Sequence, residues 1–363
     1  MYNRALDVKK SAYAKTGKTV SWTALSRMLP IWKRDPETSW LAQADSMALQ
    51  QSIRDLDRAY KNFFRRVREG GKPGFPKFKS RRHARQSYRT NGGKVVDRNH
   101  IALPKLGNVR AKVSRPLQGR FMSVTVSLDA AGRYFATFLC TDVPSKDAIA
   151  ADREVGIDLG VETLATLSDG TKIGNPRHLK KYEHRLAREQ RRLSRRKGAR
   201  RGEKQSMRYL KQRKRVARIH AKIADARTDA LHKVTTMLAD ENQVLCMEDL
   251  NAKGMVRNHD LAKAVSDASF GEFARLLEYK CAERGRTLVK VDRFYPSSKT
   301  CSACGHRLDA LSLSVRSWDC PSCGVHHDRD VNAARNILAE GKRILSNTEG
   351  TAGHAGTVAD ITA

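Results

Sequence analysis

Acidic residues are scarce in this sequence. Its 363 residues include 38 Asp and Glu against 70 Lys and Arg, a formal net charge of +32. A surplus of this size is too large for an ordinary enzyme and indicates a polyanion as partner. The sequence also lacks a run of about 18 apolar residues, so it predicts no membrane-spanning helix. Residues 1–10 lack the apolar segment of a secretory signal, and no short amphipathic segment favours a membrane anchor.

Cysteine is uncommon as well. There are seven cysteines, an odd number that disfavours a secreted disulfide scaffold and favours a reducing compartment. Hydrophobic residues make up 40% of the chain, which is enough for packed cores and too much for wholesale disorder. We therefore expect two or three globular domains. Three cysteines stand singly in apolar contexts, namely Cys140, Cys246 and Cys281.

The other four cysteines form two matched pairs near the C-terminus. Each pair has the C-x2-C spacing that places two thiolates on one tight turn, and two such turns complete a tetrahedral zinc site. Gly305 and Gly324 directly follow the pairs, where the turn needs permissive backbone angles. Four protein ligands leave no open position, so the pattern predicts a structural zinc; disulfides or a redox pair are the alternatives. The predicted ligands are Cys301, Cys304, Cys320 and Cys323.

Residues 1–66 predict helices, because apolar residues such as Ile53 and Leu56 recur every three or four positions. Glycine and proline then interrupt the pattern between Gly70 and Pro76. Residues 72–89 interleave basic and aromatic side chains, an arrangement in which bases stack on rings while cations meet phosphates. We interpret this stretch as a nucleic-acid contact, with a solvated basic loop as the alternative. Its aromatic residues are Phe75, Phe78 and Tyr88.

Residues 95–146 predict β-structure. Val124, Val126 and Leu128 alternate with polar residues, as in a half-buried strand, and a turn at 129–132 leads to a second strand over 134–140. This pattern indicates a hairpin within a small barrel or sheet.

Strands and helices alternate from residue 155 to residue 291, which predicts an α/β domain. Within it, residues 177–222 carry 20 Lys and Arg but only three Glu. Two apolar helix stripes around Leu186 and Ile219, separated by a bend at 196–202, predict a helical hairpin. Like charges at this density repel unless a polyanion screens them, so the hairpin is a second candidate for nucleic-acid binding. A merely solvated surface is the alternative.

Three acids occupy positions that suggest metal binding. Asp158 interrupts an apolar strand, Glu248 ends another, and Asp330 begins a predicted helix. A carboxylate in a buried strand is costly unless a charge neutralises it, and three acids from separate elements can hold two Mg²⁺ ions across a phosphodiester. Two neighbouring acids have non-catalytic alternatives. Asp328 would cap the predicted helix, and Asp249 would face solvent.

Together these stretches resemble the TnpB (OrfB) proteins encoded by bacterial insertion sequences, which are relatives of type V CRISPR effector nucleases. The resemblance rests on five stretches and the basic hairpin, in the family's order: GIDLGVE at 156–162, MEDLN at 247–251, SSKTCSACG at 297–305, CPSCG at 320–324 and DRDVNAARNI at 328–337.

The resemblance implies an RNA-guided, Mg²⁺-dependent DNA endonuclease of a transposable element, which cuts double-stranded DNA beside a short motif using a guide RNA from the element's end. It implies that Asp158, Glu248 and Asp330 bind two Mg²⁺ ions and catalyse the cleavage. Asp330 is preferred to Asp328 because it lies two residues before Asn332, as the family's third acid does. We expect a cytoplasmic, nucleoid-associated bacterial protein without membrane contact.

The implied fold class is α/β, with a RuvC-like (RNase H-fold) nuclease domain that carries an inserted zinc ribbon. A helical segment and a small, wedge-like β-barrel precede it. The expected domains are a recognition-like helical segment (1–70), the β domain (71–146), the nuclease domain with its basic hairpin at 177–238 (147–298 and 324–345), the zinc ribbon (299–323) and a disordered tail (346–363).

One departure from the family concerns the start of the sequence. Met1–Leu6 resembles the family's first helix entered midway, so we expect the first barrel strand to be missing, through either a misassigned start codon or a truncation. A truncated nucleic-acid-binding protein without cleavage is therefore one alternative function. A strand-transferring transposase is another, because many RNase H-like transposases also use three acids.

The predicted nucleic-acid contacts are basic residues of the two stretches described above. They are Lys72, Lys77, Lys79, Arg81, Arg82, Arg191, Arg192, Arg195, Arg196, Lys211, Arg213, Lys214 and Arg215.

Overall fold

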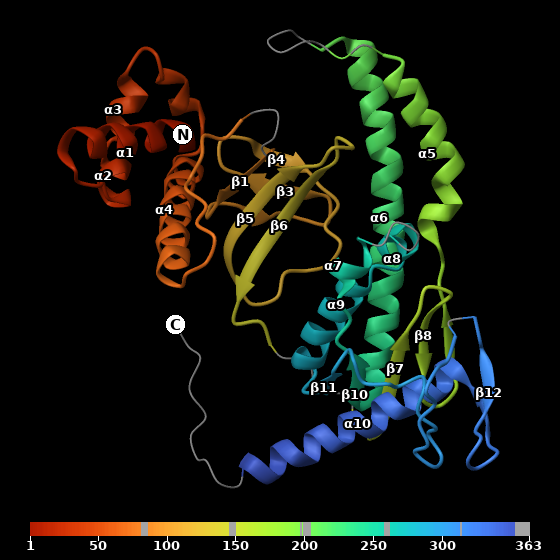
Figure 1. The fold of residues 1–363 in the computed structure, drawn as a ribbon. Coiled ribbons are helices and arrows are strands. Elements are labelled where there is room, and N and C mark those ends of the chain that lie inside the picture. Colours follow the sequence, from red (N-terminus) through yellow and green to blue (C-terminus); the bar gives the residue numbers. More distant parts are fainter. Residues whose placement is uncertain are drawn as a thin grey trace. The chain divides into compact units, whose positions relative to one another are not determined.

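The computed structural model describes residues 1–80, 86–144, 150–196, 198, 205–257, 262–312 and 314–352 (Figure 1). The chain divides into two compact units, Met1–Pro144 and Ser145–Ala363. Among the described residues, no helix has the length and apolarity needed to cross a membrane. The predicted contacts Arg81 and Arg82 lie outside the described residues.

The first unit begins with the predicted helices. Asp45 caps the longest of them by accepting hydrogen bonds from the backbone N–H groups of Met47 and Ala48. Leu6, Leu25 and their neighbours bury an apolar core between the helices. The helices are α1 (Tyr2–Thr16), α2 (Trp22–Arg27), α3 (Leu29–Arg34), the 3₁₀ helix η1 (Ser39–Gln43) and α4 (Ser46–Arg68).

The β-structure of the first unit consists of two three-stranded antiparallel sheets. One has the order β1-β5-β6, with β1 (Gln86–Thr90), β5 (Arg120–Leu128) and β6 (Tyr134–Thr141); β5 and β6 form the predicted hairpin. The other has the order β2-β3-β4, with β2 (Lys94–Val95), β3 (His100–Leu103) and β4 (Gly107–Arg110). Ile101, Leu103 and Val124 form one apolar cluster with residues from both sheets.

The second unit is built on a five-stranded mixed sheet of order β11-β10-β7-β8-β9. The central strand β7 pairs in parallel with β10, which pairs in parallel with β11, whereas β8 and β9 run antiparallel. The predicted alternation of strands and helices is therefore confirmed. The strands are β7 (Arg153–Leu159), β8 (Thr163–Leu167), β9 (Lys172–Gly174), β10 (Asn242–Glu248) and β11 (Thr287–Val291).

Helices cover both faces of this sheet. Leu245 and Met247 of β10 belong to the same core as residues of α6 (Met207–Glu241) and α9 (Phe270–Glu283). Between them in sequence, Cys246 belongs to the cluster beneath α10 (Arg329–Ala352), because successive side chains of a strand point to opposite faces. The short helices α7 (Ala252–Met255) and α8 (Ala262–Ala268) precede α9.

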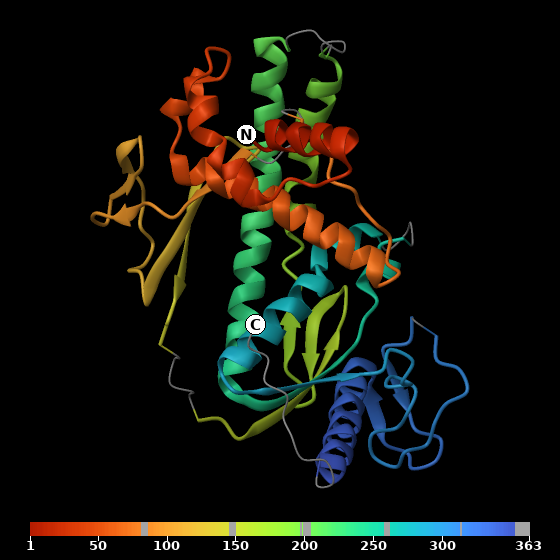
Figure 2. The same cartoon turned by 90° about the vertical axis from the view of Figure 1, so that its left-hand side faces the viewer.

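The basic hairpin consists of α5 (His178–Ser194) and the N-terminal half of α6 (Figures 1 and 2). Leu186 of α5 packs with Val216, Ile219 and Ile223 of α6, as the two apolar stripes predict. At its base, both oxygens of Asp267 accept hydrogen bonds of 3.0 Å from the backbone N–H of Leu179. Asp267 of α8 therefore caps α5 from another element and ties the hairpin to the sheet domain.

The final helix is longer than expected. The tail predicted to begin at residue 346 is helical as far as Ala352, because Ile344 and Leu345 pack into the cluster beneath α10 and carry the helix onward. Residues 353–363 lie outside the described residues. Before α10, the paired strands β12 (Ser317–Asp319) and β13 (His326–Asp328) belong to the cysteine-rich segment.

Candidate active site and metal centre

The carboxyl ends of two neighbouring parallel strands hold the first two candidate acids. Ile157 of β7 pairs with Met247 of β10, so Asp158 and Glu248 follow at the same level of the sheet. In open α/β sheets, ligands bind at this edge. The two acids line a cavity of about 560 Å³, together with the third, Asp330 of α10. The structure thus brings all three predicted acids to one cavity.

Gly156 allows α10 to approach the sheet closely enough to deliver Asp330. A Cβ atom at Gly156 would lie 1.9 Å from the backbone oxygen of Ala334, one turn after Asp330. Gly341 plays the same part further along, because a Cβ there would lie 2.2 Å from Sγ of Cys246. Only glycine permits such a backbone approach.

Electrostatics at the cavity are dominated by the burial of its acids and by their mutual repulsion. Burial raises the pKa of Asp158 to about 7, and repulsion from Glu248 and Asp330 adds to the rise, while Arg329 opposes it. Burial also raises the pKa of Glu248, against a hydrogen bond of 2.6 Å that the Ser297 hydroxyl donates to its Oε1. Oxygen donors that repel one another in a desolvated cavity fit a hard divalent cation such as Mg²⁺.

The neighbouring acids make other contacts. Oδ1 of Asp328 accepts hydrogen bonds from the backbone N–H groups of Asp330 and Val331, and its Oδ2 pairs with Lys172 at 2.7 Å. Asp328 therefore caps α10, which is the alternative role predicted for it. Asp249 pairs with Arg293 at 2.5 Å in a half-exposed position. Neither residue lines the cavity.

Sequence reasoning missed three arginines that line the same cavity. Arg177 precedes α5 in the left-handed backbone region, with φ of 49°. Arg316 pairs with Glu162 at 2.6 Å, and Arg329 donates a hydrogen bond of 2.9 Å to the carbonyl of Ser312. Their spacing along the chain does not predict this grouping, because only the fold brings the three residues together.

The four cysteines form a compact cluster. Their sulfur atoms all lie within 4.8 Å of one another, with Sγ–Sγ distances of 3.7 Å between Cys301 and Cys323 and 3.6 Å between Cys304 and Cys320. A tetrahedron of thiolates around zinc has edges of about 3.8 Å, so the donor set fits that ion. Both glycines after the pairs adopt positive φ, as predicted.

The cysteine cluster is joined to the acid cavity through α10. Oδ1 of Asn332 accepts a hydrogen bond of 2.8 Å from the backbone N–H of Ser302, between the first two cysteines. Its Nδ2, like that of Asn336, donates to the carbonyl of Thr300, at 2.7 and 2.6 Å. Asn336 also donates to the carbonyl of Ser297, whose hydroxyl contacts Glu248. The buried side-chain amides of Asn332 and Asn336 therefore link the cysteine cluster to the elements that carry Glu248 and Asp330.

Two protein-family models match this chain. One described as "Probable transposase" (OrfB_IS605) matches residues 138–259, and one described as "Cas12f1-like, TNB domain" matches residues 270–337. A Streptomyces pristinaespiralis protein named "Putative RNA-guided DNA endonuclease" is 42% identical over 94% of this chain and 83% of its own length.

The chain belongs to the TnpB (OrfB) family. The resemblance inferred from its motifs is thereby confirmed. A second relative of this TnpB-family chain is the Escherichia coli K12 protein named "Putative RNA-guided DNA endonuclease InsQ". It is 34% identical over 95% of this chain and 87% of its own length. Among solved structures, a Cas12f1–sgRNA–target DNA complex covers 93% of this chain and 90% of that chain, with 16% identity and a TM-score of 0.37.

The predicted nucleic-acid contacts of this TnpB-family chain occupy different environments. Lys72 and Lys77 are exposed, and Lys79 is held to Asn3 by two backbone hydrogen bonds and lies over the Tyr2 ring. Arg192 pairs with Glu189, and Arg196 donates to the carbonyl of Arg208. The remaining predicted contacts are exposed side chains of the hairpin: Arg191, Arg195, Lys211, Arg213, Lys214 and Arg215.

Proposed function

We propose that this chain is an RNA-guided DNA endonuclease that hydrolyses phosphodiester bonds with Mg²⁺ held by Asp158, Glu248 and Asp330. The observation that carries this proposal is that three acids from three separate elements line one cavity. The names of the curated relatives support the reaction class.

We assign the second unit to the RuvC-like, RNase H fold. In its support, β7, β8 and β9 form an antiparallel meander, and β10 and β11 then add in parallel on the other side of β7. Asp158 on the central strand and Glu248 on its parallel neighbour suit the catalytic acids of that fold.

Each residue of the cavity has a proposed part. When bound, Mg²⁺ supplies Lewis-acid stabilisation of charge at the scissile phosphate and makes water more acidic. The three carboxylates provide the oxygen ligands that this ion prefers. The hydroxyl of Ser297 orients the Glu248 carboxylate by its hydrogen bond. Arg177 and Arg329 bring positive charge to the cavity wall, which attracts a phosphodiester.

The four cysteines are proposed to bind a structural zinc ion, which leaves no ligand position for a reacting water. The proposed domains are a recognition-like helical segment (1–70), a wedge-like β domain (71–146), the nuclease domain with its zinc ribbon at 299–323, and a nuclease helix extended to Ala352. Guide RNA and motif-bearing target DNA are the proposed partners, in the bacterial cytoplasm. The net charge of +32 supports polyanionic partners.

The test combines the purified full chain with a guide RNA from the element's end, Mg²⁺ and DNA that carries the matching target. Cleavage that needs both the guide and the target supports the proposal. Joined DNA products, in place of cleaved DNA with free ends, would instead support a transposase that transfers strands. Tight RNA and DNA binding with neither product would support a binding protein without catalysis.

A further inference from the structure

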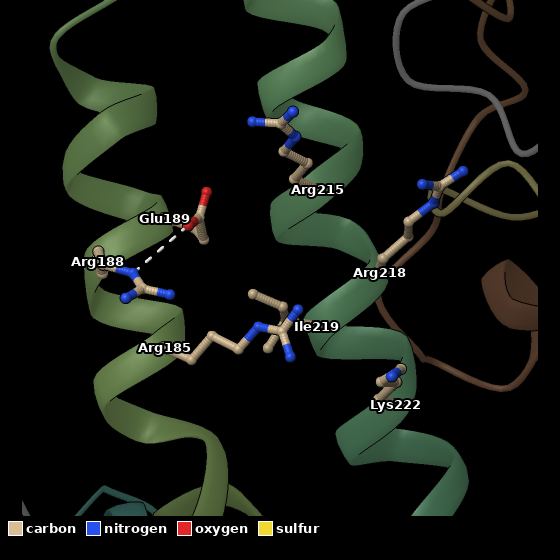
Figure 3. Close-up of a pocket in the computed structure, with 7 residues that line it drawn as sticks. All are labelled: Arg185, Arg188, Glu189, Arg215, Arg218, Ile219 and Lys222. Atoms are coloured by element: carbon tan, nitrogen blue, oxygen red, sulfur yellow. Dashed lines mark ion pairs between the residues drawn. The ribbon is translucent and has the colours of Figure 1, made fainter.

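We propose that a cavity between α5 and α6 binds phosphate groups of a nucleic-acid backbone. The proposal rests on the proposed function for its partner but not on cleavage. The cavity, called here the hairpin pocket, has a volume of about 370 Å³ (Figure 3). Its lining residues are Arg185, Arg188, Glu189, Arg215, Arg218, Ile219 and Lys222.

The charge of the hairpin pocket is strongly one-sided. Five of its seven lining residues are cationic, and its one acid, Glu189, already has partners. Gln212 donates a hydrogen bond of 2.8 Å to Oε2 of Glu189, and Arg192 donates one of 3.0 Å to Oε1. The hydrogen bond from Gln212, followed by the nearby arginines, lowers the pKa of Glu189, so its charge is satisfied locally.

Four cations of the pocket lie beyond ion-pair distance of every carboxylate among the described residues, although Arg215 still acts on Glu189 at longer range. They are Arg185, Arg215, Arg218 and Lys222. Like charges gathered on two adjacent helices repel, and a bound anion removes that cost. The pocket therefore favours an external anion.

The pocket has a shape suited to phosphate. In Figure 3, Arg185 extends from α5 towards Ile219, and Arg215 extends from α6 into the space between the helices. Guanidinium groups donate paired hydrogen bonds that match phosphate oxygens. Figure 3 shows the Glu189 carboxylate at a level between Arg215 and Arg185, so each guanidinium would meet its own phosphate of one backbone, one from each helix.

The two helices hold this spacing without a ligand. Gln212, which is 1% exposed, donates from Nε2 to the backbone carbonyl of Glu189 at 3.0 Å as well as to its carboxylate. The apolar contacts of Leu186 with Val216 and Ile219 flank this clamp. The pocket is therefore formed in advance, which reduces the cost of binding.

The surroundings of the pocket favour a long polyanion over a single small anion. The hairpin sequence from 177 to 222 carries 20 Lys and Arg and three Glu, and exposed cations continue along both helices beyond the pocket. A nucleic-acid backbone presents phosphates at regular intervals and can meet the pocket and these cations together. RNA and DNA share this chemistry and are separated by experiment.

The test measures binding of the full chain to a labelled DNA duplex and to a labelled single-stranded RNA, without Mg²⁺, over a range of salt. The double variant Arg185→Gln/Arg215→Gln should weaken binding about tenfold to whichever nucleic acid occupies the pocket. Its log–log salt slope should fall by about 1.8 on the DNA duplex or about 1.4 on the RNA, as two phosphate contacts are lost.

A control removes two exposed cations of the same unit that lie outside residues 177–222 and already pair with carboxylates. Lys233 pairs with Asp229 at 2.7 Å, and Arg275 pairs with Glu272 at 2.6 Å. The variant Lys233→Gln/Arg275→Gln should bind within about twofold of the unaltered chain, with its salt slope nearly unchanged. Equal losses in both double variants would overturn the proposal. Binding to polyglutamate, a polyanion without phosphate, is measured in the same way. If the pocket variant loses as much affinity for polyglutamate as for nucleic acid, the phosphate specificity of the pocket is overturned.

A second measurement needs no substitution. Phenylglyoxal modifies accessible arginines, and bound nucleic acid should protect Arg185 and Arg215 from it; full reactivity in the complex would contradict the proposal. The Asp158→Asn variant should keep this binding and protection. Absence of cleavage by the unaltered chain with protection intact therefore counts only against the proposed nuclease, and cleavage by that chain without protection counts only against the pocket.

Discussion

The backbone N–H of Ser302 donates a hydrogen bond of 2.8 Å to Oδ1 of Asn332. Ser302 lies between two cysteines of the proposed zinc site, and Asn332 lies two residues after Asp330. Because Asn332 is 1% exposed, this contact is shielded from water and fixes the cysteine-rich segment to the start of α10. The metal centre and the acid cavity therefore share one scaffold.

Replacing Asn332 should damage both folding and cleavage. The Asn332→Ala variant leaves the Ser302 N–H and the Thr300 carbonyl with one partner fewer, which should cost about 1–3 kcal/mol of unfolding free energy. Denaturant unfolding measures this loss, with Asn62→Ala on the exposed surface of α4 as the control. Equal stability of the two variants would refute the structural role of Asn332.

Gly156 offers a test of how α10 reaches the sheet. Gly156→Ala places a Cβ where the Ala334 oxygen lies, so α10 must move away from β7, at an expected cost of about 3 kcal/mol or more. Gly174→Ala in the same sheet is the control, because a Cβ there meets nothing within 4 Å. Thermal unfolding should separate the two variants clearly, and similar unfolding temperatures would contradict the close packing.

The raised pKa of Asp158 predicts a pH dependence of stability without added Mg²⁺. The carboxyl titrates near 3.8 when unfolded and at about 7 when folded, so between these pH values the folded state holds a proton that the unfolded chain releases. Its contribution should decline as pH rises from about 4 to about 7, by up to about 4 kcal/mol.

Other groups titrate in the same range, so the measurement compares unfolding free energies of the unaltered chain and Asp158→Asn. The difference between them should grow in favour of the variant up to about pH 7 and then level off. Parallel stability curves across this interval would show that the carboxyl is not desolvated.

Removal of the proposed zinc should unfold the cysteine-rich segment. Cys320→Ser should lower the bound zinc content, the unfolding temperature and the cleavage rate together, because the segment contacts α10 through Asn332. Cys140→Ser, outside the cluster, should retain the metal. Metal analysis decides the point, and full zinc content in Cys320→Ser would contradict the four-thiolate site.

Much of the second unit follows from local sequence rules. The alternation of strands and helices predicted from residue 155 to residue 291 runs on to α9 (Phe270–Glu283) and β11 (Thr287–Val291), because apolar periodicity reflects one buried face directly. The helical end of the chain was mispredicted from residue 346 to Ala352, since composition there does not reveal the packing of Ile344 and Leu345.

The candidate site was only partly accessible from sequence. Acids within apolar strands stand out, as Asp158 does, because burial of charge needs a reason. Arg177 and Arg316 do not stand out in so basic a chain, where any arginine is an ordinary surface residue. The cations of the hairpin pocket had a weak signal: Arg185 and Arg188, like Arg215 and Arg218, are three residues apart beside an apolar stripe.

The central claim is that three carboxylates of one cavity catalyse cleavage together. The most direct measurement compares guide-dependent DNA cleavage by Glu248→Gln with that by Asp249→Asn, its neighbour outside the cavity. We predict a loss of about a thousandfold or more for Glu248→Gln, matched by Asp158→Asn and Asp330→Asn, and nearly full activity for Asp249→Asn. Cleavage that survives in the three cavity variants, or fails only in Asp249→Asn, would contradict the account.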